Sequence, residues 1–180
     1  MKHVKFGKFK DVYKGKIFTI KHCDVVLPNG KKDFFEFASR PSSVNVLAFN
    51  KKNELLLIKE YRYGYKGPTW FLPAGRIDND TPKKAAQREL REETGYRAKK
   101  LKLIQKNAPS NTMLWDVYFF AAKDLELDPL PKDLTEEIEV HFVPFKKAVQ
   151  MALDGTIKNE YASYMILHFS YLLKTKKFNW

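Results

Sequence analysis

Cysteine is almost absent from this sequence, and no long hydrophobic run occurs in it. Cys23 is the only cysteine among 180 residues, which excludes an internal disulfide and is typical of a protein from a reducing compartment. No apolar run approaches the roughly 18–20 residues that a membrane-spanning helix needs. The charged N-terminal segment lacks the apolar core of a signal peptide. We therefore expect a cytoplasmic protein with no membrane partner.

Acidic residues are few relative to basic ones. The chain has 33 Lys and Arg against 21 Asp and Glu, a formal net charge of +12. Such a surface attracts nucleic acids, acidic membranes or anionic small molecules, and it also serves solubility alone. Both interpretations stay open. Hydrophobic residues make up 44% of the chain and aromatic residues 14%, which excludes a disordered chain and predicts a substantial core.

Runs of strand-forming residues and a break between them predict that the chain has two parts, an N-terminal β unit and a main domain. Residues 11–38 are rich in Val, Ile and Phe and contain a turn at Pro28-Asn29-Gly30, which predicts a small antiparallel β unit. A break at Arg40-Pro41 then predicts a boundary, with the N-terminal β unit over 1–40 and the main domain over 41–180. Glycines and prolines predict a loop from 64 to 75. Further strands are expected at 44–49, 55–58, 101–104, 114–121 and 138–143.

Three helices are expected. Thr81 is a suitable N-cap, Pro82 suits the first helical position and Gly95 a C-terminal stop. A second helix is predicted over 145–153, and a third from Asn159 or Glu160. Its apolar stripe predicts core packing: Ala162, Met165, Ile166, Phe169, Leu172 and Leu173. Mixed strands and helices of this kind predict a layered fold of α and β elements.

Three glutamates gather on one face of the first predicted helix. Glu89, Glu92 and Glu93 are spaced i, i+3 and i+4, so their carboxylates share a side and repel by about a few tenths of a kcal/mol per pair. The helix macrodipole also disfavours anions near the C-terminus, and an ion pair from Arg88 to Glu92 relieves only part of the conflict. Bound Mg²⁺ would resolve it, because Mg²⁺ takes carboxylate oxygens as ligands. A solvated, charged helix face is the alternative interpretation.

Two neighbouring segments favour a metal site. The stretch Leu72-Pro73-Ala74-Gly75 could bring backbone carbonyls close to the helix, because glycine allows a sharp turn. The acidic stretch Glu136-Glu137-Ile138-Glu139 could supply a further ligand or a general base. An ordinary surface loop is the alternative for the acidic stretch.

Gly75 followed by Arg88-Glu89-Leu90-Arg91-Glu92-Glu93-Thr94-Gly95-Tyr96 resembles the Nudix box. This resemblance implies an α/β fold, a Nudix-like α/β/α sandwich with a mixed sheet, and hydrolysis that depends on Mg²⁺, with Mn²⁺ as the alternative ion. It implies that Glu89 and Glu93 are metal ligands, together with the Ala74 carbonyl. Glu92 would be an auxiliary group, and Arg88 would orient the glutamates. Gly75 and Arg88 are separated by one residue fewer than usual, a form that resembles the GDP-mannose hydrolase branch.

A wider resemblance, over residues 10–170, is to the ADP-ribose pyrophosphatase and nucleotide-sugar hydrolase group. It implies cleavage of a nucleoside diphosphate sugar into a nucleoside monophosphate and a sugar phosphate, with Glu136 or Glu137 as the general base. It also implies a homodimer that exchanges the N-terminal β unit. The implied substrate-binding residues are Phe35 stacking on the base, Glu36 hydrogen-bonding it, and Arg40 and Arg62 at the diphosphate.

Other interpretations of these residues and of the charge stay open. Phe35 could be a core residue, and Arg40 and Arg62 ordinary surface arginines. The net charge of +12 suggests a second function, a nucleic-acid-directed protein: an RNA 5′-end hydrolase or a basic RNA-binding module. An RNA-binding module needs no face of glutamates, and acidic clusters repel phosphates without metal. We therefore do not expect a nucleic-acid partner.

Overall fold

A computed structural model describes residues 3–131 and 137–180. The chain divides into two compact units. The smaller unit consists of Met1–Ser42 and Asn107–Val117, and the larger unit of Ser43–Lys106 and Tyr118–Trp180. The predicted boundary near residue 40 did not anticipate that the second short segment belongs with the N-terminal strands.

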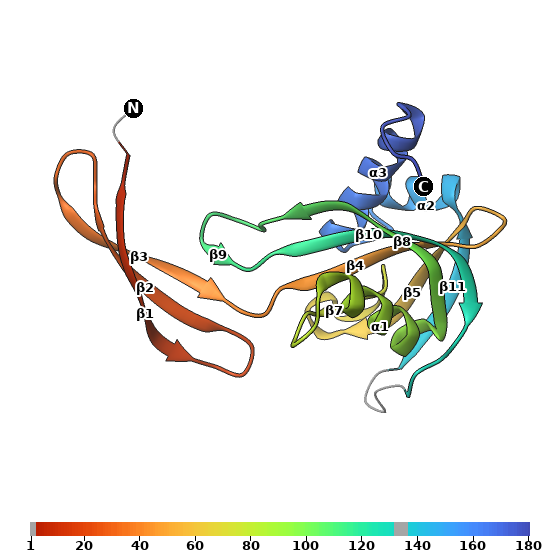
Figure 1. The fold of residues 1–180 in the computed structure, drawn as a ribbon, viewed down its shortest axis with the longest axis horizontal. Helices are drawn as coiled ribbons and strands as arrows, with labels where there is room; N and C mark the ends of the chain where they lie inside the picture. Colours follow the sequence, from red (N-terminus) through yellow and green to blue (C-terminus); the bar gives the residue numbers. More distant parts are fainter. Residues whose placement is uncertain (1–2, 132–136) are drawn as a thin grey trace. The chain divides into compact units, whose positions relative to one another are not determined.

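The smaller unit is a four-stranded sheet in the order β1-β2-β3-β9 (Figure 1, red, orange and green). Three of its strands form an antiparallel meander, whose second turn contains Gly30 at a φ of 86°. The fourth pairs in parallel with β3, with Ala38 opposite Met113. This pairing brings the second segment into the unit. The strands are β1 (Lys5–Lys14), β2 (Thr19–Val26), β3 (Lys32–Ser39) and β9 (Met113–Leu114).

The larger unit is built on a seven-stranded sheet. Five strands follow the order β11-β5-β4-β10-β8, while β6 pairs with β5 and β7 with β4. The short 3-10 turn η1 (Tyr63–Tyr65) connects β5 to β6. The strands are β4 (Ser43–Phe49), β5 (Glu54–Arg62), β6 (Gly67–Phe71), β7 (Ala74–Arg76), β8 (Tyr96–Asn107), β10 (Val117–Leu127) and β11 (Ile138–Pro144).

The prediction of a loop from 64 to 75 was wrong, because this stretch contains β6 and β7. Glycine and proline do not exclude strands here. Pro68 lies in β6 opposite Tyr61 of β5, and proline is compatible with a strand on the side that needs no hydrogen-bond donor. Gly75 lies in β7 opposite Val44 of β4. Its backbone therefore continues the sheet beside the first helix.

The three predicted helices are present. Helix α1 (Pro82–Thr94) is capped by Thr81, whose Oγ1 accepts a hydrogen bond from the Lys84 N–H, and it ends at Gly95 in the left-handed conformation. Helix α2 spans Phe145–Leu153, and α3 spans Glu160–Lys174. The Asn159 side chain caps α3 through the Ala162 N–H. The first four residues of the predicted α3 stripe are buried, whereas Leu173 is 37% exposed.

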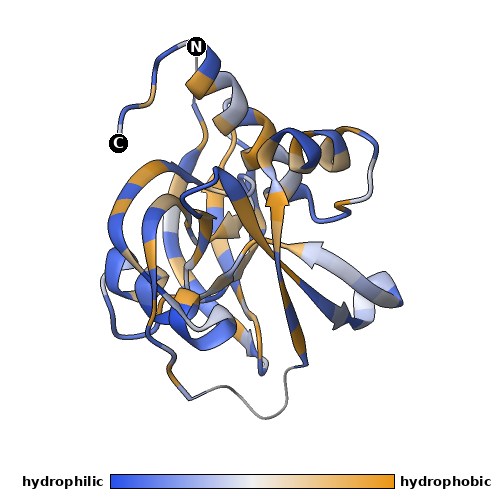
Figure 2. Ribbon diagram, turned by 90° about the vertical axis from the view of Figure 1, so that its right-hand side faces the viewer, coloured by the Kyte–Doolittle hydropathy of each residue, from blue (hydrophilic) through white to orange (hydrophobic). Residues whose placement is uncertain are grey.

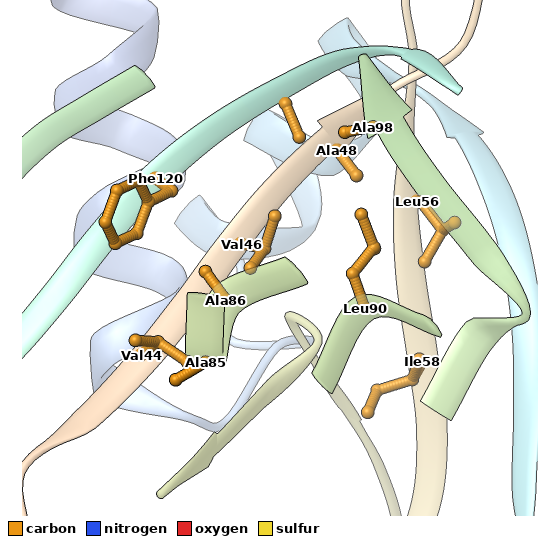
Figure 3. Close-up of a cluster of buried hydrophobic side chains, with 11 residues drawn as sticks. Val44, Val46, Ala48, Leu56, Ile58, Ala85, Ala86, Leu90, Ala98 and Phe120 are labelled. Atoms are coloured by element: carbon orange, nitrogen blue, oxygen red, sulfur yellow. The ribbon is translucent and has the colours of Figure 1, made fainter. Parts of the chain in front are cut away.

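The helices lie on both faces of the larger sheet. On one face, Ala85, Ala86 and Leu90 of α1 pack in one hydrophobic cluster with alternate residues of β4 and β5 (Figure 3). On the other face, Phe49 contacts Phe145 of α2 and Phe169 of α3. Hydrophobic and hydrophilic residues alternate along several strands (Figure 2), as expected when the two faces differ. No helix in the described part of the chain is long and apolar enough to cross a membrane.

Candidate active site

Helix α1 turns two of its three clustered glutamates inward. Glu89 is 9% exposed and Glu93 is 6% exposed, although both are charged residues that are rarely buried. The Ala74 N–H of β7 donates a hydrogen bond to Glu93 Oε2 at 2.8 Å. A Cβ on Gly75 would lie only 1.9 Å from Glu89 Cδ. Both carboxylates therefore lie against the backbone of residues 74–75.

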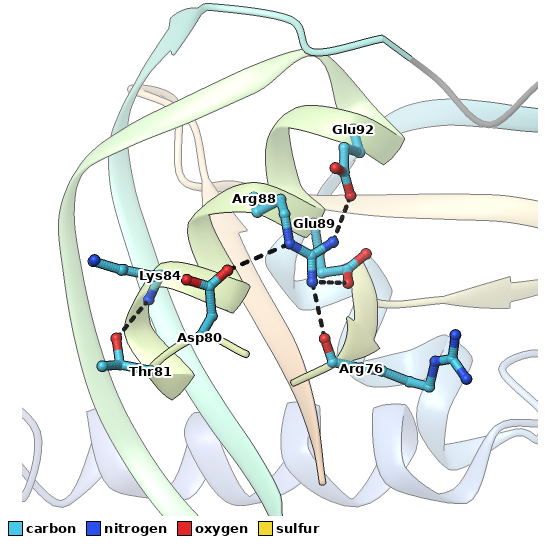
Figure 4. A network of polar contacts seen from close by, with 7 residues as sticks. All are labelled: Arg76, Asp80, Thr81, Lys84, Arg88, Glu89 and Glu92. Carbon is cyan, nitrogen blue, oxygen red and sulfur yellow. Dashed lines mark hydrogen bonds and ion pairs between the residues drawn. The ribbon is translucent and has the colours of Figure 1, made fainter. Parts of the chain in front are cut away.

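Arg88 ties this glutamate face together (Figure 4). Its Nη1 group donates to Glu92 Oε2 at 2.7 Å, and its Nη2 group lies 2.8 Å from Glu89 Oε1. The Nη2 group also donates to the Arg76 carbonyl at 2.9 Å. Burial lowers the pKa of Arg88, but the charges and hydrogen bonds of the two glutamates raise it, and the resulting pKa lies above its ordinary value. The ion pair to Glu92 that the sequence predicted is present.

A polar cavity of about 360 Å³ opens beside this face, within the larger unit. Its charged walls combine three arginines with three carboxylates, so it can hold a cation and an anionic group together. Such a combination suits an enzyme that acts on a phosphate compound with Mg²⁺, because Mg²⁺ is usually held by carboxylates and substrate phosphates at once. The lining residues are Arg62, Ala74, Gly75, Arg76, Asp78, Arg88, Glu89 and Glu93.

The donor set fits a hard divalent cation. Carboxylate and carbonyl oxygens are the ligands that Mg²⁺ prefers, and Glu89, Glu93 and Ala74 all line one cavity. A Cβ at Gly75 would fill the place where the Glu89 carboxylate approaches the backbone. Within the described residues, no three His, Cys, Asp or Glu side chains are grouped to hold a metal.

The other predicted catalytic residues are Glu92, Glu136 and Glu137. None of them is among the described residues that line the cavity. Glu92 is partly buried and faces Arg88. Glu137 is exposed and directly precedes β11. Glu136 falls on 132–136, outside the described residues.

Three predicted substrate-binding residues belong to the smaller unit. Phe35 is 36% exposed and contacts the edge of the Phe6 ring, so it is not a core residue of the described chain. Glu36 Oε1 lies 2.9 Å from His22 Nε2. The Arg40 guanidinium lies 4.9 Å from the centre of the Trp115 ring. The fourth, Arg62, lines the cavity of the larger unit.

Three further residues lie at or near the cavity and were not among the predicted site residues. Arg76 and Asp78 line it, and their position directly after Gly75 was the available signal. Glu60 is buried and paired with Arg62 at 2.7 Å. The alternation of β5 places Glu60 and Arg62 on one face, which a strand prediction extended to residue 62 would have indicated.

Comparison with known proteins identifies the family. The model of the NUDIX domain matches residues 39–164. The chain is 30% identical over 161 residues to an ADP-ribose pyrophosphatase of Bacillus subtilis (strain 168), with 87% of each chain covered. It is 32% identical over 149 residues to a GDP-mannose pyrophosphatase of Yersinia enterocolitica, covering 76% of this chain and 78% of the relative. The chain therefore belongs to the Nudix family.

A solved structure supports the fold independently. The crystal structure of an ADP compounds hydrolase superposes with a TM-score of 0.84 at 22% identity, covering 96% of this chain and 95% of the other. The predicted α/β class with a Nudix fold is thus confirmed. Nudix hydrolases generally act with a divalent metal ion, in agreement with the oxygen donors gathered around the cavity.

Proposed function

We propose that this chain hydrolyses the pyrophosphate bond of a nucleoside diphosphate sugar. The observation that carries the proposal is the pair of buried carboxylates, Glu89 and Glu93, beside Gly75 in a cavity that arginines also line. ADP-ribose and GDP-mannose are the first candidates, because relatives of 30% and 32% identity are named pyrophosphatases of these compounds. The products would be a nucleoside monophosphate and a sugar phosphate.

The metal ligands in this proposal are Glu89, Glu93 and the Ala74 carbonyl. Mg²⁺ is the proposed ion and Mn²⁺ the alternative, since both accept carboxylate and carbonyl oxygens. Bound there, a divalent ion supplies charge neutralisation for the diphosphate and activation of the attacking water. Arg88 holds the Glu89 and Glu92 carboxylates in place through contacts of 2.8 and 2.7 Å.

The chain's own side chains supply the other parts of the reaction. Water attacks one phosphorus of the diphosphate, the bond to the bridging oxygen breaks, and that oxygen leaves with the other phosphate. Glu136 or Glu137 accepts the proton of the attacking water, a contribution typically of about 10²–10⁴-fold. Arg62 binds a non-bridging oxygen through charge-assisted hydrogen bonds.

The smaller unit completes the site from a second chain of a homodimer. In this proposal Phe35 stacks on the base, Glu36 hydrogen-bonds it and Arg40 contacts the diphosphate. Several apolar side chains on the strands of this unit are exposed, which supports burial against another surface. They are Phe6, Phe9, Val12, Phe34 and Phe35, each at least 36% exposed.

The lysines of β8 have a simpler explanation than nucleic-acid binding. Strand β8 is an edge strand, and lysines on edge strands prevent pairing with other chains. Lys99 and Lys100 pair with Glu126 and Asp124, and Lys102 lies over the Phe178 ring. The nucleic-acid-directed alternative therefore gains no support from this strand.

A substrate panel tests the proposal. Purified protein is assayed with ADP-ribose, GDP-mannose, other nucleotide sugars, dinucleoside polyphosphates and capped RNA, each with Mg²⁺, with Mn²⁺ and with EDTA. We expect metal-dependent release of a nucleoside monophosphate from one of the nucleotide sugars. Turnover confined to capped RNA would overturn the proposal in favour of the RNA 5′-end reaction.

A further inference from the structure

Glu60 is a buried carboxylate to which the proposed chemistry gives no part. It is 6% exposed and lies near the end of β5. The strand alternation places it on the same face as Leu56 and Ile58, which pack against α1. A buried carboxylate is costly unless charged or hydrogen-bonding partners compensate it. The burial of Glu60 beside these apolar side chains therefore needs an explanation.

Glu60 is paired with the cavity arginine, Arg62. Arg62 Nε–H donates to Glu60 Oε1 at 2.9 Å, and Arg62 Nη2 lies 2.7 Å from the same oxygen. The guanidinium also lies over Phe71, with Cζ 5.5 Å from the ring centre. Glu60 therefore holds one edge of the guanidinium, and the Phe71 ring covers one of its faces.

We propose that Glu60 is a positioning residue that holds the Arg62 guanidinium at the cavity wall, ready for an anionic oxygen of the diphosphate. This inference rests on the proposed function, because it assigns a purpose to Arg62 in that reaction. Glu60 itself does not touch the substrate. A free arginine loses rotamer freedom when it binds a ligand, and an arginine that is already ordered loses less.

Glu60 could have one of two roles toward Arg62, and removal of its charge would change the affinity for the substrate in opposite directions in the two cases. If its carboxylate only neutralised Arg62, removal of the charge would strengthen the attraction between Arg62 and the diphosphate. If Glu60 orders Arg62, removal of the charge weakens binding. The sign of the change in KM for Glu60→Gln therefore separates the two roles.

A double-mutant cycle tests the positioning role. We expect Glu60→Gln to raise KM for the nucleotide sugar by up to about tenfold, with kcat changed by less than about twofold. In an Arg62→Ala background, the same substitution should leave KM unchanged, because the ordered group is gone. The matched control is Glu54→Gln at the other end of β5, where the Glu54 carboxylate binds the Asn50 side chain. Its KM should equal that of the wild type.

Three outcomes would overturn the inference: a lowered KM in Glu60→Gln, an unchanged KM, or the same rise with and without Arg62. If Glu60→Gln fails to fold, Glu60→Asp keeps the charge but shortens the reach, and a raised KM is expected from it in the same cycle.

A spectroscopic measurement separates this inference from the proposed function. The Nε–H signal of Arg62 in a ¹⁵N NMR spectrum should show an ordered, slowly exchanging proton in the wild type and in Glu54→Gln. It should become mobile in Glu60→Gln. This result does not depend on the substrate, so it stands even if the panel finds no nucleotide-sugar turnover. An Arg62 signal that is mobile in the wild type would overturn the positioning role directly.

Discussion

The Glu89 carboxylate occupies the space in which a side chain on Gly75 would lie. A Cβ at Gly75 would be 1.9 Å from Glu89 Cδ and 2.1 Å from Oε1. This contact fastens α1 to β7 at the point where the Ala74 backbone meets Glu93. The position requires glycine for close approach and not for an unusual backbone angle, since Gly75 pairs within the β4–β7 ladder.

Gly75→Ala should remove activity with little loss of fold. The methyl group displaces the end of the Glu89 side chain, which carries one of the proposed metal ligands. We expect kcat/KM to fall by about 100-fold or more, the scale at which misplaced catalytic groups act. Thermal unfolding should shift by only a few degrees, about the effect of 1 kcal/mol in a protein of this size.

Gly67→Ala is the matched control for this substitution. Gly67 also lies in a strand of the larger unit, and nothing lies within 4 Å of a Cβ placed there. Its activity should match that of the wild type. Equal losses of activity in the two variants would contradict a specific role for the Gly75–Glu89 contact.

Glu93→Gln should abolish turnover while the protein stays folded. The amide keeps the volume and an oxygen that can accept from the Ala74 N–H, but it removes the negative charge that a divalent cation requires. Stability without metal should stay level or rise by about a few tenths of a kcal/mol, because repulsion with Glu89 is relieved. Turnover, thermal unfolding and Mn²⁺ binding by electron paramagnetic resonance measure these effects.

Glu126→Gln provides the comparison for Glu93→Gln, because Glu126 is an exposed residue of β10 that pairs with Lys99. It should retain full turnover and Mn²⁺ binding. More than about a tenth of wild-type turnover in Glu93→Gln would be incompatible with its assignment as a metal ligand.

Arg88→Lys should lower both activity and stability. Lysine cannot reproduce the planar set of contacts that Arg88 makes with Glu89, Glu92 and the Arg76 carbonyl. Weakening these hydrogen bonds to charged groups should cost about 1–3 kcal/mol in the free energy of unfolding. Activity should fall further than stability explains, because the Glu89 carboxylate loses its orientation.

Arg91→Lys distinguishes an active-site effect from a general one on α1. Arg91 is on the same helix and donates to the carbonyl and the side chain of Asp128, away from the cavity residues. Its stability should fall by a similar amount, measured by urea unfolding, with kcat/KM preserved. If both variants lose activity in proportion to stability, Arg88 has a structural role only.

Local chemistry explains why the sequence predicted the helices well. A capping hydroxyl at Thr81, proline at the first helical position and glycine at the end determine the bounds of α1 without help from distant residues. The spacing of Glu89 and Glu93 followed from the helical period alone. The burial of these glutamates and their contact with β7 depend on how the sheet brings residues 74–75 to the helix, so only the structure could give them.

The features that the sequence could not predict depend on pairings between segments that are far apart in the chain. The parallel contact of Ala38 with Met113 joins residues that are far apart in the chain, and no local pattern indicates it. The same holds for β7, whose three residues are a strand only because β4 lies beside them. Strand alternation could place Glu60 on the same face as Arg62, but the burial of Glu60 and its contact with Arg62 are visible only in the structure.

If the two chains of a homodimer share their active sites, two inactive variants can restore activity to each other when they are mixed. If Phe35 acts on the partner's site, a heterodimer of a Phe35→Ala chain with a Glu93→Gln chain contains one site with both native residues. Such heterodimers should show about half the wild-type rate, because one of the two symmetric sites is intact. Each variant alone should be nearly inactive. If Phe35 acts within its own chain, neither site of the heterodimer is native and mixing restores nothing. Heterodimers purified through two different tags, assayed with the preferred nucleotide sugar, measure the difference. A monomer in light scattering at micromolar concentration, or no recovery in verified heterodimers, would overturn the shared site.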